Sequence, residues 1–258
     1  MSVKKLLDLG GRVAIVTGGS RGLGLQIAEA LGEMGAKLAL TARKKDELDA
    51  AVAHLAKSGI EAHAWVCDMG KRETIPGVFD QILAKFGRVD ILVNNAGAVW
   101  GAPAEYHPLE AWDKLINLNL IGAFVMSQQA AKKSMIPAKW GRIVNVASVA
   151  GLYASDPAQV RTVSYNATKH GVVGMTKQLA AEWGEHGITV NAICPGFFPS
   201  KMTRATLDTT GEMVRKATPT RRLGGPEDLK GLAVLLASEA SRHITGEAIS
   251  VDGGAMLI

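Results

Sequence analysis

Tyr165 and Lys169 are the residues of this chain whose types and spacing could do chemistry together. Residues four apart on a helix share one face, so this spacing brings an ammonium group beside a phenol. A nearby cation favours the ionised phenol, and we therefore expect Lys169 to lower the pKa of Tyr165 from about 10 toward neutrality. Such a phenol can exchange a proton with a carbonyl or alcohol oxygen. The pair alone is a weak signal, because the same spacing arises by chance in many helices.

The elements that must position this pair alternate between strand and helix along most of the chain. Apolar, β-rich runs predict seven strands, at residues 12–17, 37–42, 62–67, 89–93, 142–147, 189–193 and 248–251. Helical periodicity predicts helices at residues 23–34, 46–57, 74–86, 110–117, 120–133, 164–185 and 226–238. Repeated strand–helix units with apolar strands imply a parallel sheet covered on both faces. We predict one α/β domain over residues 1–258, a doubly wound (Rossmann) parallel sheet of seven strands.

Residues 195–220 form the one long stretch with neither period, and they are rich in Pro, Thr and Gly. A loop of this length in a compact domain is usually a functional lid or a disordered segment. We expect a substrate lid at about residues 196–220.

The composition argues against several other classes of protein. No apolar run approaches the roughly 18 residues of a membrane span, and the first residues do not form a signal peptide. Cys67 and Cys194 are too few for a disulfide framework or a zinc site, and we expect buried thiols in a reducing cytoplasm. The six histidines lack metal-binding spacing, so we expect no metal. The net charge is +5, but the positively charged residues are scattered along the sequence and form no nucleic-acid motif. We therefore expect no nucleic-acid or membrane partner.

A glycine-rich turn follows the first predicted strand, with the spacing Gly-x-x-x-Gly-x-Gly. Glycine lets the backbone approach a pyrophosphate, which the free N–H groups of the following helix then stabilise. Any turn between strand and helix could use glycine, but doubly wound sheets bind dinucleotides at this position. We therefore expect a dinucleotide to contact Gly18, Ser20, Arg21, Gly22, Leu23 and Gly24.

The end of the second predicted strand favours NADP(H) over NAD(H). An NAD site usually has a carboxylate there for the ribose 2′-hydroxyl, whereas an NADP site has arginine for the 2′-phosphate. Here Arg43, Lys44 and Lys45 come before the first carboxylate, Asp46. We predict that Arg43 and Arg21 bind the phosphate, the alternative being a solvated basic turn. Asp68, after the third strand, is open to two interpretations, an acceptor for the adenine amino group or a helix N-cap.

Further motifs complete a pattern that spans essentially the whole chain. They are Thr17-Gly-x-x-x-Gly22-x-Gly24, Asn94-Asn95-Ala96-Gly97, Asn119, Ser148, Tyr165-x-x-x-Lys169, Pro195-Gly196 and Asp252-Gly253-Gly254. In this order and spacing the sequence resembles the short-chain dehydrogenase/reductases. Within that family, residues 191–203 and the wide separation of Ser148 from Tyr165 look most like bacterial gluconate 5-dehydrogenases and 3-oxoacyl reductases.

The resemblance implies specific roles for the matching residues. Tyr165 would be the general acid in reduction and the general base in oxidation, and Lys169 would lower its pKa and hold the nicotinamide ribose. Ser148 would bind the substrate oxygen, and Asn119 would support a water that links Lys169 to solvent. Further cofactor contacts are implied at Met69, Asn95, Ala96, Gly97, Pro195, Gly196 and Phe198. The family also implies a homotetramer, or a dimer.

The substrate is the least determined part of this interpretation. The segment between Ser148 and Tyr165 is longer than is usual in the family, so substrates of better-known relatives do not transfer safely. Candidate substrate residues are Trp100, Tyr153, Arg161, Phe197 and Met202. The apolar ones favour a 3-oxoacyl thioester, whereas Arg161 and Lys201 favour a sugar acid or polyol. A binding protein that senses NADP without chemistry is the alternative from a different class.

Overall fold

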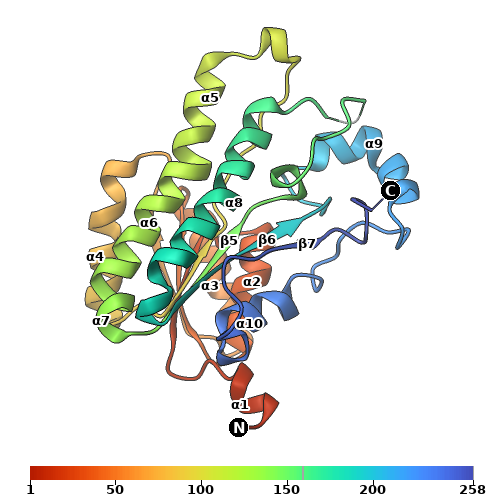
Figure 1. Cartoon of the computed structure of the whole chain (residues 1–258). Helices are drawn as coiled ribbons and strands as arrows, with labels where there is room; N and C mark the ends of the chain where they lie inside the picture. Colours follow the sequence, from red (N-terminus) through yellow and green to blue (C-terminus); the bar gives the residue numbers. More distant parts are fainter. Residues whose placement is uncertain (159, 258) are drawn as a thin grey trace.

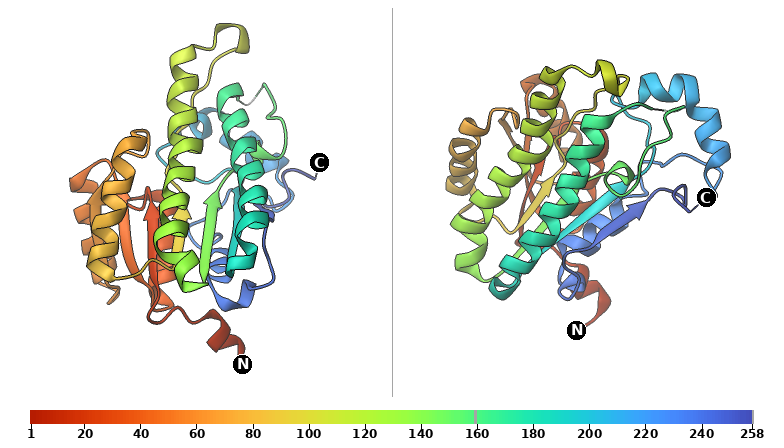
Figure 2. Two further views of the ribbon diagram at one scale, coloured as in Figure 1. Left: turned by 60° about the vertical axis from the view of Figure 1, so that its left-hand side comes forward. Right: turned by 45° about the horizontal axis from the view of Figure 1, so that its top comes forward.

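A parallel sheet of seven strands forms the centre of the molecule, with helices on both of its faces (Figure 1, Figure 2). The structure is a computed structural model, and it describes residues 1–158 and 160–257. The strands are β1 (Val13–Thr17), β2 (Lys37–Ala42), β3 (Ala62–Val66), β4 (Ile91–Asn94), β5 (Gly141–Val146), β6 (Ile188–Pro195) and β7 (Ala248–Val251). Their order is β3-β2-β1-β4-β5-β6-β7, and every neighbouring pair is parallel. The predicted doubly wound sheet is confirmed.

Two sets of helices cover the two faces. The helices are α1 (Val3–Leu7), α2 (Gly22–Glu33), α3 (Lys45–Ala56), α4 (Ile75–Phe86), α5 (Leu109–Leu115), α6 (Gly122–Ala130), α7 (Ile136–Ala138), α8 (Val163–Trp183), α9 (Arg204–Ala217) and α10 (Lys230–Ala237). One face packs against α2, α3 and α10, and the other against α4, α6 and α8. Successive residues of β1 alternate between these layers, since Ala14 and Val16 join the first core and Ile15 the second. This double burial explains why the strands are continuous apolar runs.

The helical segment between β4 and β5 differs from the two helices expected at residues 110–117 and 120–133. It is one continuous run from Leu109 to Ala138, which includes π-helical segments at Ile116–Ile121 and Ala131–Met135. No proline or glycine interrupts the chain at residues 118 and 119. Because π-helical segments often occur at functional sites, the position of Asn119 inside the first one is informative.

The stretch at residues 195–220 is not irregular throughout, and that prediction was wrong. It contains α9, a helix of 14 residues with one buried side chain, Val214. Three threonines and a glycine in the helix lower its intrinsic propensity, which concealed it in the sequence. In the same region α10 begins at Lys230, after turns over residues 226–229 rather than at Pro226 as expected.

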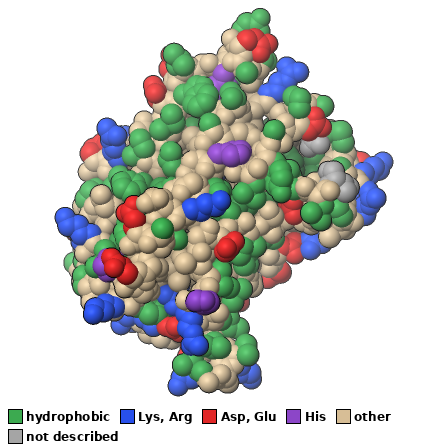
Figure 3. Space-filling view, in the orientation of Figure 1, with side chains coloured by type: hydrophobic (Ala, Val, Ile, Leu, Met, Phe, Trp, Pro, Cys, Tyr) green, Lys and Arg blue, Asp and Glu red, His purple; other side chains and the backbone are tan. Residues whose placement is uncertain are grey.

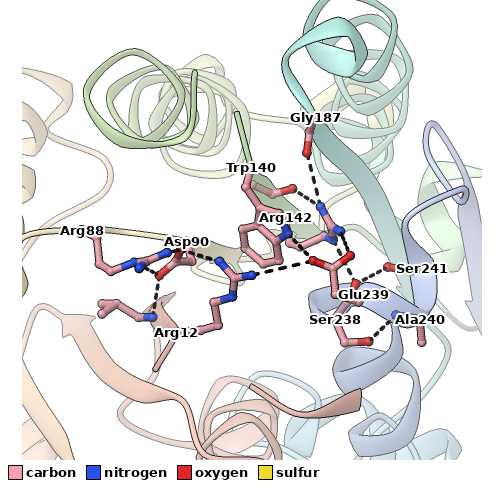
Figure 4. Close-up of polar contacts among 12 residues, drawn as sticks. Arg12, Arg88, Asp90, Trp140, Arg142, Gly187, Ser238, Glu239, Ala240 and Ser241 are labelled. Atoms are coloured by element: carbon pink, nitrogen blue, oxygen red, sulfur yellow. Dashed lines mark hydrogen bonds and ion pairs between the residues drawn. The ribbon is translucent and has the colours of Figure 1, made fainter. Parts of the chain in front are cut away.

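The chain reverses its direction of growth across the sheet between β1 and β4, which are neighbours. In an open α/β sheet, such a switch point leaves a crevice at the carboxyl ends of the strands. The amino ends, at the opposite edge, instead carry a polar network around Arg12, Asp90, Trp140, Arg142 and Glu239 (Figure 4). The crevice and the network are therefore separated by the length of the strands.

On the face seen in Figure 3, the Lys and Arg side chains are scattered rather than gathered into one patch. Within the two described ranges, no helix is both long and apolar enough to span a membrane.

Candidate active site

A cavity of about 510 Å³ opens at the carboxyl ends of the strands, at the switch point. Every residue that the sequence assigns to the cofactor lines it, from the glycine turn after β1 to Phe198 after β6. Ser148, Tyr165, Lys169 and Met202 line it as well. The structure therefore brings these residues, from seven separate parts of the chain, into one site.

Tyr165 and Lys169 lie on α8, one turn apart, at the inner end of this cavity. The Lys169 Nζ is 5.6 Å from the centre of the Tyr165 ring and donates a hydrogen bond of 2.7 Å to the carbonyl of Val146. Lys169 is only 5% exposed, although it carries a charge. The α8 helix thus holds the ammonium beneath the phenol, with the end of β5 on its other side.

Burial dominates the proton affinities of this pair. It lowers the pKa of Lys169 to about 8, because the charged amine loses its hydration. Burial also raises the pKa of Tyr165, and a hydrogen bond with Ser148 offsets part of that increase. The expectation that Lys169 brings the phenol below its usual pKa was therefore wrong for this structure, where desolvation is the larger effect.

Ser148 follows β5 and begins a single turn of 3₁₀ helix, Val149–Gly151. Its Oγ accepts a hydrogen bond of 3.1 Å from the backbone N–H of Ala150. This contact uses a lone pair and leaves the hydroxyl proton free to be donated. Ser148 therefore presents a donor to the cavity beside the Tyr165 hydroxyl.

Asn119, for which the resemblance implies support of a water next to Lys169, is buried and does not line the cavity. Its amide accepts from the N–H of Ala98 at 2.9 Å and donates to the Ala98 carbonyl at 3.0 Å. The same amide donates to the Thr168 hydroxyl on α8 at 3.1 Å. In this arrangement Asn119 fixes the loop after β4 against α8, next to Lys169.

The glycine turn has the backbone geometry that its sequence predicted. Gly18 and Gly22 have φ angles of +65° and +56°, which other residues rarely adopt. A side chain on Gly24 would overlap the Asn95 side chain and the carbonyl of Gly18. The turn therefore packs tightly on the loop after β4 and leaves the first turn of α2 open toward the cavity.

Thr17 and Asn95 join this turn to β4. The Thr17 Oγ1 accepts from the N–H groups of Asn95 and Ala96 at 3.0 and 3.1 Å and donates to the Val93 carbonyl at 3.3 Å. The Asn95 amide donates to the carbonyls of Thr17 and Gly18 at 2.9 and 3.2 Å. These contacts hold the two loops of the switch point together, and sequence reasoning had overlooked Thr17 as their hub.

The outer end of the cavity is basic, as predicted, but it also holds a carboxylate. Arg21, Arg43 and Lys44 line it together with Glu47, from the first turn of α3. The Arg21 Nη1 is 2.7 Å from Glu47 Oε1, and the Lys44 Nζ is 3.6 Å from the same oxygen. Glu47 was not among the predicted cofactor residues, because it comes after Asp46, the first carboxylate that follows the second strand. An acidic residue in the first turn of the helix after β2 was the available signal.

Asp68 and Met69, after β3, line the cavity next to this basic end. The Asp68 Oδ1 accepts a hydrogen bond of 3.0 Å from the N–H of Gly70. The residue that caps the following 3₁₀ turn is Lys71, so the N-cap interpretation of Asp68 was wrong. Its second carboxylate oxygen remains available to the cavity.

Four of the predicted substrate residues do not line this cavity. Trp100 and Tyr153 are 44% and 47% exposed, and Arg161 is also exposed. Phe197 lines a separate cavity of about 110 Å³, whose wall it shares with Phe198. Residues that line the cavity instead are Val99 and residues 200, 201 and 203, which include Lys201.

Among the residues that the structure describes, no group of three His, Cys, Asp or Glu side chains could hold a metal ion. The donors that converge on the cavity are a phenol, an amine, a hydroxyl and backbone amides. Such a set can bind and protonate an oxygen without metal ligands.

The site and the sheet define a class of protein. The family model for short chain dehydrogenases matches residues 12–211, and the chain belongs to this family of oxidoreductases. Across 255 residues it is 38% identical to D-threitol dehydrogenase of Mycolicibacterium smegmatis, covering 98% of this chain and 96% of that protein. It is 35% identical to the 3-oxoacyl-[acyl-carrier-protein] reductase FabG of Aquifex aeolicus, covering 96% and 98%.

Solved structures of dehydrogenases also resemble this chain closely. A gluconate 5-dehydrogenase from Burkholderia cenocepacia, solved in complex with NADP and tartrate, superposes with a TM-score of 0.93. The two chains are 33% identical, and each is covered completely. The family and the fold expected from the sequence motifs are thus confirmed.

Proposed function

We propose that this protein is an NADP(H)-dependent oxidoreductase that interconverts a ketone and a secondary alcohol, with Tyr165 as the general acid and base. The observation that carries the proposal is the convergence of Tyr165, Lys169 and Ser148 at the inner end of a cavity whose outer end is basic. This arrangement pairs proton transfer with anion binding along one elongated site.

The chemistry of the inner end follows from the charge that develops on the substrate oxygen. Bound NADP(H) would supply the hydride in reduction and accept it in oxidation. As a ketone oxygen becomes negative, the hydroxyls of Tyr165 and Ser148 stabilise it by hydrogen bonds, and Tyr165 transfers its proton. The ammonium of Lys169 then stabilises the phenolate that remains, an effect that grows with charge separation in a buried site. Asn119 acts as a positioning residue, since it anchors the loop after β4 to α8.

The residues of the cavity fit a dinucleotide. The glycine turn and the start of α2 offer backbone N–H groups to a pyrophosphate. A side chain at Gly24 would overlap the Asn95 side chain and the Gly18 carbonyl, which support this turn. Arg43 lines the outer end and makes no ion pair with any residue in the described ranges, so it is available to a 2′-phosphate. A crystal structure of a relative with bound NADP supports this assignment.

A sugar acid or polyol is the substrate class that we favour. Ser200 and Lys201 line the cavity beside Met202, which provides a hydroxyl and a cation at the open side of the catalytic residues. Relatives named for threitol and gluconate act on small polyhydroxy compounds by name. A 3-oxoacyl thioester is the second candidate, supported by the apolar side chains of Val99, Phe198 and Met202, which line the same cavity.

The segment around α9 is the proposed lid. Residues 200–203, which precede it, line the cavity, and the Thr203 hydroxyl donates to the Phe198 carbonyl at 2.6 Å. Closure of this segment over the substrate would exclude water from the transferred hydride. We also propose a homotetramer in a reducing cytoplasm, in line with the free, buried thiols of Cys67 and Cys194. Light scattering of the purified protein measures the assembly.

The proposal is tested with Tyr165→Phe, which removes the hydroxyl and keeps the ring. We expect NADPH to bind unchanged and reduction of ketosugars, keto acids and 3-oxoacyl thioesters to fall by a factor of roughly 100 to 10,000. Absorbance of NADPH follows the reaction, and Tyr153→Phe, at an exposed tyrosine outside the cavity, is the matched control. Unchanged turnover in Tyr165→Phe would refute the role of the phenol. A wild-type protein that binds NADPH but turns over none of these substrates would favour the sensing protein instead.

A further inference from the structure

Glu47 occupies an unexpected position for a site that binds a phosphorylated ribose. Its carboxylate lines the cavity and lies 2.7 Å from Arg21, in the turn after β1. It also lies 3.6 Å from Lys44, at the end of β2. One carboxylate therefore neutralises two of the three cations at the outer end, whereas Arg43 has no carboxylate partner among the described residues.

The local structure holds Glu47 in this position. It is the third residue of α3, in the first turn, where the partial positive charge of a helix N-terminus stabilises a carboxylate. Its side chain is 24% exposed, while those of Arg21 and Lys44 are 48% and 60% exposed. The carboxylate is thus the least exposed member of the group, and both cations lie within ion-pair distance of it.

A 2′-phosphate and the Glu47 carboxylate require the same partner. Arginine binds either group through the same fork of N–H donors, so a phosphate that engages Arg21 competes with Glu47. The phosphate is also repelled by the carboxylate that remains nearby. A ribose 2′-hydroxyl meets the opposite situation, because a carboxylate can accept its hydrogen bond.

We propose that Glu47 is a cofactor-specificity residue, an internal counter-ion of Arg21 that weakens the preference for NADP(H) over NAD(H). The inference rests on the proposed use of a nicotinamide dinucleotide and specifies which groups set its selectivity. Arg43 provides the affinity for the 2′-phosphate, and Glu47 limits the contribution of Arg21. The protein consequently uses both cofactors, with a moderate preference for the phosphorylated one.

The test is Glu47→Gln, which keeps the shape of the side chain and removes its charge. We expect the Kd of NADPH to fall roughly three- to tenfold, the range of a partly exposed charge pair, while the Kd of NADH stays nearly constant. The fragments adenosine 2′,5′-bisphosphate and adenosine 5′-phosphate should reproduce this difference. The gain in affinity for NADPH should be smaller at high salt, because screening weakens the interactions between these charges. Calorimetric titration measures all four Kd values.

The matched control is Asp49→Asn, which changes the net charge equally on the same helix. Asp49 pairs with Lys45 at 2.6 Å and is absent from the cavity lining. A selective gain for 2′-phosphorylated ligands in Glu47→Gln alone supports the inference. The inference would be overturned if a variant shown by thermal melting to be folded gave any of three results. These are equal gains in affinity in both variants, equal gains for NADPH and NADH, or no gain in affinity for NADPH in Glu47→Gln. A wild-type protein that binds neither dinucleotide would instead refute the proposed function itself.

Discussion

Lys169 and Arg142 are cations buried at opposite edges of the same sheet, and their surroundings differ. Lys169 is 5% exposed at the carboxyl edge, and Arg142 is 3% exposed at the amino edge. Burial lowers the pKa of both, to about 8 for Lys169 and to about 10 for Arg142. Desolvation thus disfavours the charged form of both side chains, but the partners that surround the two charges differ.

Arg142 is surrounded by partners that satisfy it (Figure 4). It donates to the carbonyls of Ser238 and Gly141 at 3.0 and 2.8 Å and lies 3.4 Å from the Glu239 carboxylate. Its guanidinium and that of Arg12 also lie over the Trp140 ring, at 4.4 and 3.6 Å from the ring centre. This network joins the start of β1, β5 and the turn after α10, and Arg142 and Asp90 are buried within it while Arg12 and Glu239 are partly exposed.

Lys169, by contrast, donates to one carbonyl, that of Val146, and faces a cavity. No carboxylate in the described ranges pairs with it. A buried charge with saturated partners contributes to structure, whereas a buried charge left incompletely paired in a cavity indicates a functional site. The comparison predicts that mutations at the two edges separate activity from stability.

The largest effect is expected for Lys169→Met, which keeps the length of the side chain and removes its charge. Reduction of a ketone substrate should slow by roughly 100-fold or more, because the phenolate of Tyr165 loses its stabilising cation. The free energy of unfolding should not fall, since a desolvated charge is removed. NADPH absorbance and urea unfolding measure the two quantities, with the exposed Lys177→Met on the same helix as control. Retained activity would break the proposed contrast between the edges.

Asp90→Ala should show the reverse pattern. Asp90 accepts from the N–H of Val13 at 2.9 Å and from Arg12 and Arg88, so its removal leaves the buried N–H of Val13 unpaired and deprives two partly exposed guanidinium groups of this partner. We expect the free energy of unfolding to fall by about 1–3 kcal/mol, the cost of a buried N–H left unpaired, while turnover per folded molecule stays the same. The control is Asp80→Ala, whose ion pair with Lys133 lies on the surface. A loss of turnover without a loss of stability would contradict the assignment of this edge to structure.

Trp140→Leu should have a smaller effect in the same direction. It removes the ring beneath two guanidinium groups and the indole N–H that donates to Glu239 at 2.5 Å. A loss of about 1–2 kcal/mol in unfolding free energy is expected from these contacts. Urea unfolding of this variant alone and combined with Asp90→Ala tests whether the network acts as a unit. Strictly additive losses would show that it does not.

The pH dependence of stability should separate the edges most finely. With a pKa of about 8 when folded and 10.5 as the ordinary value, Lys169 holds fewer protons in the folded state between these limits. Stability therefore rises with pH in this window, and the deficit of the wild type relative to Lys169→Met is largest below pH 8. Unfolding titrations of both proteins from pH 7 to 9.5 measure this difference. A deficit that grows with pH would mean that burial does not disfavour the ammonium.

The parts of the site that were predictable from sequence are those built from local spacing. The turn at Gly18, Gly22 and Gly24 and the pair Tyr165 and Lys169 each lie within one turn or one helix, so their geometry follows from the backbone. The seven strands were predictable for a related reason, since burial on both faces makes each one an apolar run.

Contacts between separate elements were not predictable in this way. The ion pair of Arg21 with Glu47 depends on how two adjacent turns lie side by side. The exposure of Trp100 and Tyr153 depends on the paths of long loops, which apolar composition does not determine. The predicted direction of the Tyr165 pKa shift was wrong for the same reason. Desolvation, which raises this pKa, depends on how the whole molecule packs and not on residue spacing.

The hydrogen bonds of Thr17 to the loop after β4 have a consequence for folding during synthesis. They join residues 78 positions apart, so the dinucleotide cavity closes only after four strands have been synthesised and paired. Such nonlocal closure is slow compared with forming a helix. A nascent chain thus cannot form this site before Asn95 has left the ribosome, and the full cavity further requires the chain through residue 203. From then on, a bound cofactor would stabilise the folded form by mass action.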